Sequence, residues 1–163
     1  MLFRSKTLTF SERSGNLRFY NPHRVVKWLG GGGHVNSIGL TNCGFENWFR
    51  NIAPHLNYSC KFIVSITSTN YEEIDFMTFR LNLLDIVAIE FNASCPNSPT
   101  EADLLTNTKQ VVELVTRLRE KTKHPVLVKL SCQQNYLDII KALVGKVEAV
   151  SINSVPWNLI YPN

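Results

Sequence analysis

Two asparagines flank a cysteine directly after an apolar run, and this short segment carries the residues best suited to chemistry. Residues 86–91 are apolar apart from one glutamate, and Asn92, Cys95 and Asn97 follow them. A thiol with an ordinary pKa near about 8.5 is a competent proton acceptor after slight tuning, and a side-chain amide offers both donors and an acceptor. Loops that leave the carboxyl ends of parallel strands are where α/β proteins do chemistry. The segment therefore predicts a site.

Cysteine has a plainer interpretation, because a lone cysteine is more often a buried small hydrophobe than a catalyst. The context of Cys95 favours chemistry, since it lies in a proline-containing loop between two amides. The packing interpretation is kept for Cys43, Cys60 and Cys132. The four cysteines are too dispersed for a disulfide scaffold and form no Cys-x-x-Cys pair, so zinc or iron–sulfur sites in this chain are not expected.

Alternating strands and helices must position this site. Four short apolar runs rich in β-branched residues predict strands at 62–66, 86–91, 126–130 and 149–152. Apolar residues at helical spacing predict three helices between these strands. The first has Ile74, Met77, Leu81 and Leu84 after a Thr69/Glu72 capping box, and the second has Leu104, Val111, Val115 and Leu118 after a Thr100/Asp103 box. The third is marked by Tyr136, Ile140 and Leu143. This order implies a parallel sheet, and the absence of a glycine fingerprint favours a barrel over a dinucleotide-binding sheet.

Two charged residues interrupt predicted strands. Glu90 and Lys129 lie in apolar runs, where a buried charge costs several kcal/mol unless it is paired. Period-two alternation puts Glu90 on the face of Asn92 and Lys129 on the face of Leu127, so both charges are expected in the barrel interior near its top. The two residues could form a structural ion pair between neighbouring strands. For Glu90 this structural interpretation and a functional role are given equal weight. A catalytic position at the carboxyl end of the strand is favoured for Lys129.

Composition narrows the class of protein. The chain has 163 residues, 44% hydrophobic and 18% charged, which suits one folded domain. Its net charge of +4 comes from 17 basic and 13 acidic residues without a basic run, so no nucleic-acid partner is expected. No segment approaches the roughly 18 apolar residues of a membrane helix, and a cytoplasmic protein without a membrane partner is predicted. The glycines at 30–33 lack phosphate-loop spacing and predict a flexible turn.

The segment Asn92-Ala93-Ser94-Cys95-Pro96-Asn97-Ser98-Pro99 resembles the Asn-x-Ser-Cys-Pro-Asn-x-Pro loop of class 1 dihydroorotate dehydrogenases. These are FMN enzymes of pyrimidine biosynthesis built on a (β/α)₈ TIM barrel. Collinear segments also resemble family motifs, namely Ser5-Lys6-Thr7-Leu8-Thr9 with Arg13-Ser14-Gly15-Asn16, Asn36-Ser37-Ile38-Gly39-Leu40-Thr41-Asn42, Val128-Lys129-Leu130 and Ile152-Asn153-Ser154. The resemblance implies that residues 1–163 form a single domain, the central part of an FMN-binding barrel.

The resemblance also implies roles for individual residues. Cys95 would be the base that takes the C5 proton of dihydroorotate while a hydride passes from C6 to N5 of FMN, giving orotate. The substrate would be held by Lys6, Asn36, Ile38, Gly39, Leu40, Asn92, Asn97, Asn153 and Ser154. The cofactor would be held by Lys6, Thr7, Asn92, Lys129 and Ile152, with the lysine at position 129 beside the flavin N1/C2 carbonyl edge. No metal is implied. For single loop asparagines such as Asn36, Asn42 and Asn97, a role as turn formers stays open.

Membrane-linked, class 2 members of the family use a serine base and carry an amino-terminal membrane-binding extension, and this sequence shows neither feature. The resemblance therefore implies a soluble electron acceptor, either fumarate or NAD through an iron–sulfur partner subunit. The family is usually dimeric or larger, so a homodimer is expected. Two alternatives stay open: a related FMN-dependent dihydropyrimidine oxidoreductase, and an inactive truncated barrel that acts as a binding module. The Val155-Pro156-Trp157 segment departs from the family pattern and leaves fine pyrimidine specificity open. Because a whole barrel takes about 250 residues, the chain is expected to be an internal fragment that is inactive alone.

Overall fold

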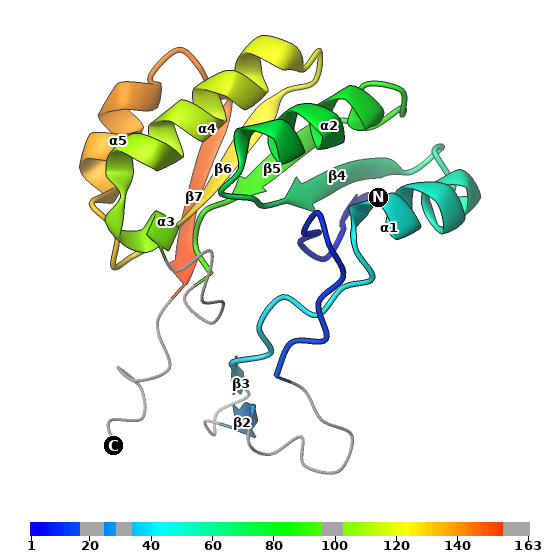
Figure 1. Ribbon diagram of the computed structural model, residues 1–163, viewed down its shortest axis with the longest axis horizontal. Coiled ribbons are helices and arrows are strands. Elements are labelled where there is room, and N and C mark those ends of the chain that lie inside the picture. The colour runs from blue at the N-terminus through cyan, green and yellow to red at the C-terminus, as the bar shows by residue number, and fades with distance from the viewer. Residues whose placement is uncertain (17–24, 29–33, 96–102, 155–163) are drawn as a thin grey trace.

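Five parallel strands form the main sheet of the protein. The structure, a computed structural model, describes residues 1–16, 25–28, 34–95 and 103–154. The sheet order is β1-β4-β5-β6-β7, with bounds Leu2–Arg4 (β1), Lys61–Ile66 (β4), Ala88–Asn92 (β5), Val126–Ser131 (β6) and Ala149–Ser154 (β7). The four predicted strands are confirmed, and the α/β architecture is that of part of a TIM barrel wall (Figure 1). Strand β1 was not predicted, because only three residues pair and one of them is arginine.

The helices follow the strands and lie on one face of the sheet (Figure 1). Their bounds are Phe45–Asn51 (α1), Ala53–His55 (η2, a 3₁₀ helix), Tyr71–Leu81 (α2), Asp103–Thr106 (α3), Thr108–Lys121 (α4) and Tyr136–Leu143 (α5). The three predicted helical stretches are therefore confirmed in position, except that Leu84 is not helical, because α2 ends at Leu81 with Asn82 as its C-cap. The second stretch is divided in two at Asn107, whose side chain accepts the N–H of Gln110 at 3.0 Å and begins α4.

The predicted cap of α2 is wrong by one residue. The N-cap is Asn70, whose Oδ1 accepts the N–H of Glu72 at 2.7 Å and that of Glu73 at 3.4 Å. Thr69 therefore does not form a capping box with Glu72. The other predicted capping residue, Thr100, lies outside the described residues.

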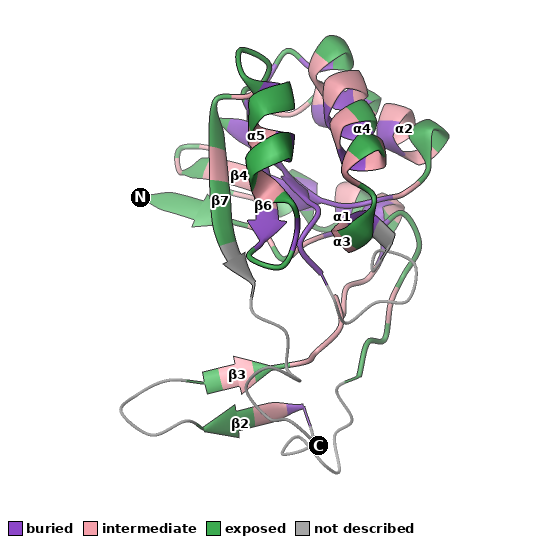
Figure 2. Cartoon of the chain, turned by 90° about the vertical axis from the view of Figure 1, so that its left-hand side faces the viewer, coloured by how far each residue is buried: buried purple, intermediate pink, exposed green. Residues whose placement is uncertain are grey.

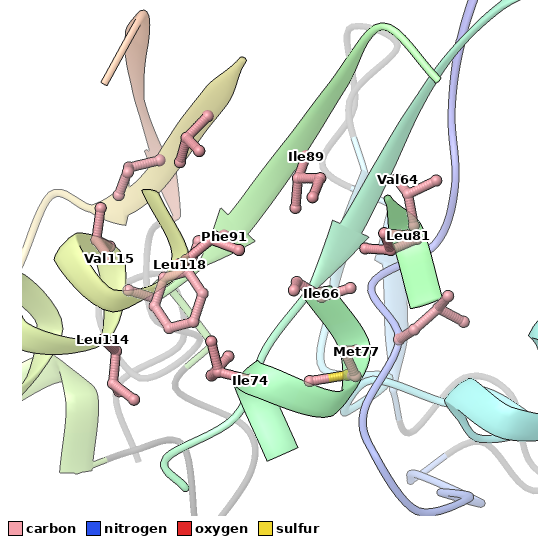
Figure 3. Packing of buried hydrophobic residues seen from close by; sticks show 14 of the residues in the cluster. Val64, Ile66, Ile74, Met77, Leu81, Ile89, Phe91, Leu114, Val115 and Leu118 are labelled. Atoms are coloured by element: carbon pink, nitrogen blue, oxygen red, sulfur yellow. The ribbon is translucent and has the colours of Figure 1, made fainter. Parts of the chain in front are cut away.

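The hydrophobic core lies between this helical layer and the sheet. Alternate residues of the strands point into it, and the apolar stripes of α2 and α4 meet them (Figure 3). The side chains at the centre of this contact are Val64, Ile66, Ile89, Phe91, Ile74, Met77, Leu81, Leu114 and Leu118. Each buried side chain of this size contributes about 1.5–3 kcal/mol of transfer free energy, so the core fixes which face of the sheet is turned away from the helices.

A small antiparallel pair stands apart from the main sheet. Strands β2 (Val26–Trp28) and β3 (His34–Asn36) pair through Trp28 and His34, whose rings lie 4.4 Å apart. Figures 1 and 2 show the pair on the side of the molecule toward which β7 runs. The predicted glycine turn at 30–33 lies between these strands, outside the described residues.

None of the described helices has the length and apolar character needed to cross a lipid bilayer. Likewise, no three histidine, cysteine, aspartate or glutamate side chains gather as metal ligands within the described ranges.

Candidate functional site

The sheet face opposite the helices carries buried polar side chains near the carboxyl ends of the strands. Glu90 is 5% exposed and Asn92 is 3% exposed. The register places Glu90 opposite Ser65 of β4 and Asn92 opposite Lys129 of β6. The prediction that Glu90 and Asn92 share a face is confirmed, and Lys129 lies beside them on the neighbouring strand.

Glu90 is held by two donors. Nη1 of Arg4 lies 2.8 Å from Oε2 and 3.1 Å from Oε1, and the Ser65 hydroxyl donates to Oε1 at 2.8 Å. The carboxylate is therefore in a structural ion pair, but the predicted partner, Lys129, is wrong. Sequence reasoning missed Arg4, because its strand was not predicted and its partner is 86 residues away.

Lys129 is half-buried, and this burial lowers the pKa of its ammonium group. The charge of Glu90 opposes the lowering of that pKa, and Arg4 adds to it. Cys95 acts on the pKa of Lys129 in the same direction as Glu90. The loop that carries the predicted base is bonded to the strand that carries the predicted flavin lysine, so both residues lie at the carboxyl edge of the sheet.

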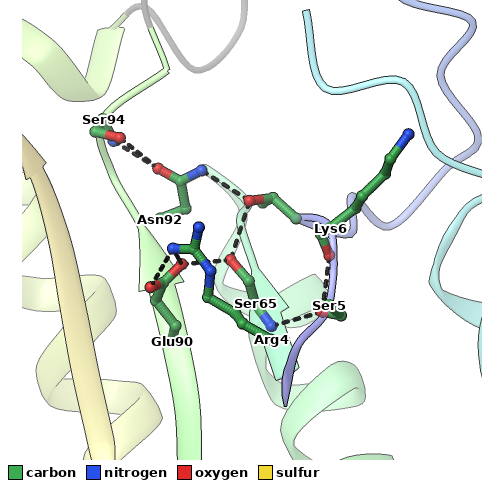
Figure 4. Close-up of polar contacts among 8 residues, drawn as sticks. Arg4, Ser5, Lys6, Ser65, Glu90, Asn92 and Ser94 are labelled. Atoms are coloured by element: carbon green, nitrogen blue, oxygen red, sulfur yellow. Dashed lines mark hydrogen bonds and ion pairs between the residues drawn. The ribbon is translucent and has the colours of Figure 1, made fainter. Parts of the chain in front are cut away.

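The Asn92 amide is fixed at both ends (Figure 4). Nδ2 donates to Thr7 Oγ1 at 2.8 Å, while Oδ1 accepts the backbone N–H of Ser94 at 3.0 Å and the Ser94 hydroxyl at 2.7 Å. Thr7 in turn lies 3.0 Å from Ser65 Oγ. These bonds join the segment after β1 to β4, to β5 and to the loop that carries the cysteine.

Cys95 is buried at the end of this described segment. Its loop is anchored to β6 by the bond from the Ala93 N–H to the Lys129 carbonyl, 2.9 Å long. Asn97, the second amide of the motif, lies outside the described residues. Burial alone does not separate the packing and catalytic interpretations of the thiol, so its role as a base stays a prediction.

Lys6 and Thr7 are adjacent in the chain but point in different directions. Thr7 joins the Asn92 network, whereas the Lys6 side chain extends away from that network into an exposed position (Figure 4). Lys6 lines a pocket of about 660 Å³ whose apolar walls include Phe3, Trp48 and Val64. In this arrangement Lys6 is not in contact with Asn92.

The segment from Asn36 to Asn42 forms a tight, self-bonded turn. Asn36 is exposed at the end of β3, and its Oδ1 lies 3.5 Å from the N–H of Ile38. Gly39 and Leu40 have φ of 76° and 59°, in the left-handed region. Asn42 Nδ2 donates to the Leu40 carbonyl at 2.6 Å, so this asparagine is a turn former. The structure does not bring Asn36 into the Asn92 network.

Strand β7 is irregular at the predicted substrate asparagine. Leu130 pairs with Ile152, and Ser131 pairs with Ser154, so Asn153 is the extra residue of a bulge. Bulges of this kind redirect side chains and are frequent beside active sites. Ile152 is 41% exposed. The bulge lies beside Leu130 and Ser131, which follow Lys129 on β6.

A parallel α/β sheet with polar side chains gathered at the carboxyl ends of its strands defines a barrel-type protein with a ligand site at that end. The model of the dihydroorotate dehydrogenase family matches residues 2–159, and the chain belongs to this family. The resemblance found in the sequence is therefore confirmed.

Three relatives illustrate the similarity. The chain is 33% identical to dihydroorotate dehydrogenase B (NAD(+)), catalytic subunit, of Petrotoga mobilis over 93% of its length and 50% of the relative's. It is 35% identical to a putative dihydroorotate dehydrogenase A (fumarate) of Aquifex aeolicus over 78% of its length and 40% of the relative's. It is 29% identical to the B-type catalytic subunit of Thermoplasma volcanium over 93% of its length and 49% of the relative's. The chain thus spans about half the length, or less, of these curated relatives.

Proposed function

We propose that the polypeptide carrying this chain oxidises dihydroorotate to orotate in pyrimidine biosynthesis, with FMN as cofactor. The observation that carries the proposal is the placement of a buried amide, Asn92, opposite a half-buried ammonium, Lys129, with Cys95 close by. A planar pyrimidine with a carboxylate requires directional donors and a positive charge. This edge of the sheet offers both.

The residues present also fit FMN. A flavin ring carries carbonyl oxygens along one edge, and Thr7, Asn92 and Lys129 supply a hydroxyl, an amide and a cation on one face of the sheet. Lys6 and Ile152 would complete the cofactor contacts. When bound, FMN supplies the acceptor for the hydride that leaves C6 of the substrate. The protein's part is to hold this ring and to place the cation beside its carbonyl edge.

Cys95 would take the proton from C5 of the substrate. A cation near a thiol favours its thiolate form, and Lys129 would supply that cation from β6, to which the loop of Cys95 is bonded. The thiol is buried, and a buried base would take the proton with little competition from water. The substrate would be oriented by the amides of Asn36, Asn92, Asn97 and Asn153, by Lys6 and Ser154, and by the backbone of Ile38, Gly39 and Leu40. Asn36 lies on the β2–β3 pair, so this pair would have to lie over the bound pyrimidine.

The names of the relatives support two candidate electron acceptors. Names that specify NAD(+) support NAD as the final acceptor through a further subunit, and the name that specifies fumarate supports direct reduction of fumarate. Both acceptors are soluble, which accords with a cytoplasmic enzyme, and we propose a homodimer for the native polypeptide. Measuring turnover with fumarate and with NAD separates the two acceptors.

Substrate profiling tests the function. The native polypeptide, expressed at its natural length and loaded with FMN, is mixed without oxygen with dihydroorotate or with dihydrouracil, which lacks the carboxylate. We expect dihydroorotate to bleach the flavin absorbance and dihydrouracil to do so far more slowly. Preference for dihydrouracil would instead support a related dihydropyrimidine oxidoreductase. A stable, flavin-free protein would support a binding module.

A further inference from the structure

A line of hydrogen bonds crosses the sheet from Glu90 to Asn92. The carboxylate accepts from Ser65 Oγ at 2.8 Å, Ser65 Oγ lies 3.0 Å from Thr7 Oγ1, and Thr7 Oγ1 accepts from Asn92 Nδ2 at 2.8 Å. Glu90 and Asn92 are two residues apart on one strand, yet the line between them passes through two other segments (Figure 4).

The direction of every bond in this line is set by Glu90. A carboxylate held by an arginine has no proton to give, so the Ser65 hydroxyl must donate to it. A serine has one hydroxyl proton, so Ser65 accepts from Thr7. Thr7 has then used its own proton and accepts from an N–H of Asn92.

Within the described residues, Asn92 is left with one hydrogen-bonding group that has no partner. Its Oδ1 already accepts two bonds from Ser94, at 3.0 and 2.7 Å. One Nδ2 proton goes to Thr7, and nothing in the described part of the chain accepts the other. The amide therefore offers a donor, and not an acceptor, to a ligand.

We propose that Glu90 is a positioning residue that, through Ser65 and Thr7, fixes the amide of Asn92 so that it presents an N–H. Asn92 then selects a ligand oxygen, such as a ring carbonyl or carboxylate, and discriminates against a ligand N–H at that position. A rotated amide would place Nδ2 against the Ser94 N–H and leave two donors facing each other in a buried site. That the selected oxygen belongs to the pyrimidine or the flavin rests on the proposed function.

Arg4 anchors the Glu90 end of this hydrogen-bond network. Its Nη1 donates to both carboxylate oxygens, so both oxygens of Glu90 act as acceptors. Ser94 holds the other end of the amide, so a test must disturb Glu90 while leaving Ser94 intact.

The test observes the side-chain amide protons of Asn92 by NMR in the native polypeptide with isotopically labelled asparagine. Asn92→Asp assigns the signals by their loss. Ser65→Ala removes the hydroxyl that joins Glu90 to Thr7. We expect the Asn92 amide protons to exchange with water about fivefold faster or more, as for loss of one net hydrogen bond. Glu90→Gln keeps the shape but allows either bond direction, so we expect two sets of Asn92 signals.

Ser68→Ala is the matched control. Ser68 is also a buried serine after β4, but its hydroxyl bonds to Glu73 and to the N–H of Asn70. Its loss should leave the Asn92 signals and exchange rates unchanged. Unchanged single signals in folded Ser65→Ala and Glu90→Gln would overturn the proposal and assign the orientation to Ser94 alone. The NMR measurement needs no ligand, so it tests the orientation of Asn92 alone. The proposed function is tested separately, and it fails if the unsubstituted protein does not bind orotate.

Discussion

Asn92 lies directly opposite Lys129 in the parallel pairing of β5 with β6. Lys129 therefore has a neutral amide as its neighbour on β5 and a serine, Ser151, as its neighbour on β7, while the Glu90 carboxylate is bonded to Arg4 and Ser65. Among the described residues no side chain forms an ion pair with Lys129, and an unpaired charge is costly in a half-buried position. This cost is consistent with a lysine kept for a ligand.

Replacing Lys129 by methionine separates stability from function. Because burial already opposes the charge, we expect the free energy of unfolding to stay within about 1 kcal/mol of the unsubstituted value or to rise. Affinity for FMN should fall by about tenfold or more, equivalent to about 1.4 kcal/mol. Thermal unfolding and flavin titration measure the two quantities. Lys123→Met, at an exposed position, is the control and should change neither. Retained flavin affinity in Lys129→Met would argue against a cofactor role.

Gly15 supports the turn at 38–42 by allowing close approach. It has φ of 63°, and a Cβ at this position would lie 2.1 Å from Thr41 Oγ1 and 2.4 Å from the Ile38 carbonyl oxygen. Gly15→Ala should therefore cost more than the roughly 1–2 kcal/mol of the left-handed conformation alone, and should weaken binding of orotate. Gly145 also has positive φ but has no atom within 4 Å of such a Cβ, so Gly145→Ala isolates the conformational cost. Equal losses of stability in the two variants would contradict the close-approach argument. Urea denaturation measures both.

His124 predicts a dependence of stability on pH. The ring is buried, and this burial lowers its pKa below the ordinary value of 6.5, although the Leu81 carbonyl 3.2 Å from Nε2 opposes the lowering. The unfolded chain then binds a proton more readily than the folded one. Stability from the neutral ring is full above about pH 6.5 and declines as the pH falls toward the folded pKa. Denaturation at several pH values should show this decline in the unsubstituted protein and a weaker one in His124→Gln. The exposed His55→Gln should keep the full decline.

Asp75 connects α2 to α4 and predicts a second pH effect, at acid pH. Arg117 donates to both carboxylate oxygens, at 2.6 and 2.7 Å, and lowers the pKa of Asp75 to about 2, with a further bond from Lys121. The stabilisation is present above the unfolded pKa of about 3.8 and is lost as the pH falls through 2. Asp75→Asn should lower the free energy of unfolding at neutral pH, and the difference from the unsubstituted protein should shrink below pH 3.8 and vanish only below pH 2. A constant difference across this range would show that packing, and not the ion pair, is lost.

Much of the fold was readable from the sequence because parallel strands buried on both faces give continuous apolar runs. The runs at 62–66 and 126–130 became β4 and β6 almost unchanged. Caps were less predictable, because Thr69 and Asn70 are both good N-cap residues and only the backbone decides between them. In the same way, Asn107 ends one helical stretch by capping the next.

The site was readable only in part. Alternation put Glu90 and Asn92 on one face, but the partner of Glu90 depends on the register of β1, a strand of three residues. The opposite directions of Lys6 and Thr7 follow from where the chain leaves that strand, which no local pattern encodes. The bulge at Asn153 likewise depends on how β7 pairs with β6.

Rapid reduction of the flavin tests the central claim, that Cys95 is the base at the carboxyl edge of this sheet. The native polypeptide, loaded with FMN and free of oxygen, is mixed with dihydroorotate, and the loss of flavin absorbance is followed for the unsubstituted protein, Cys95→Ser and Cys95→Ala. A positioned general base contributes about 10²–10⁴-fold to a rate, so Cys95→Ala should slow reduction by that factor while orotate still binds. Cys60→Ala, at a partly buried cysteine far along the chain, is the control. Reduction of the flavin in Cys95→Ala at the unsubstituted rate would contradict the assignment.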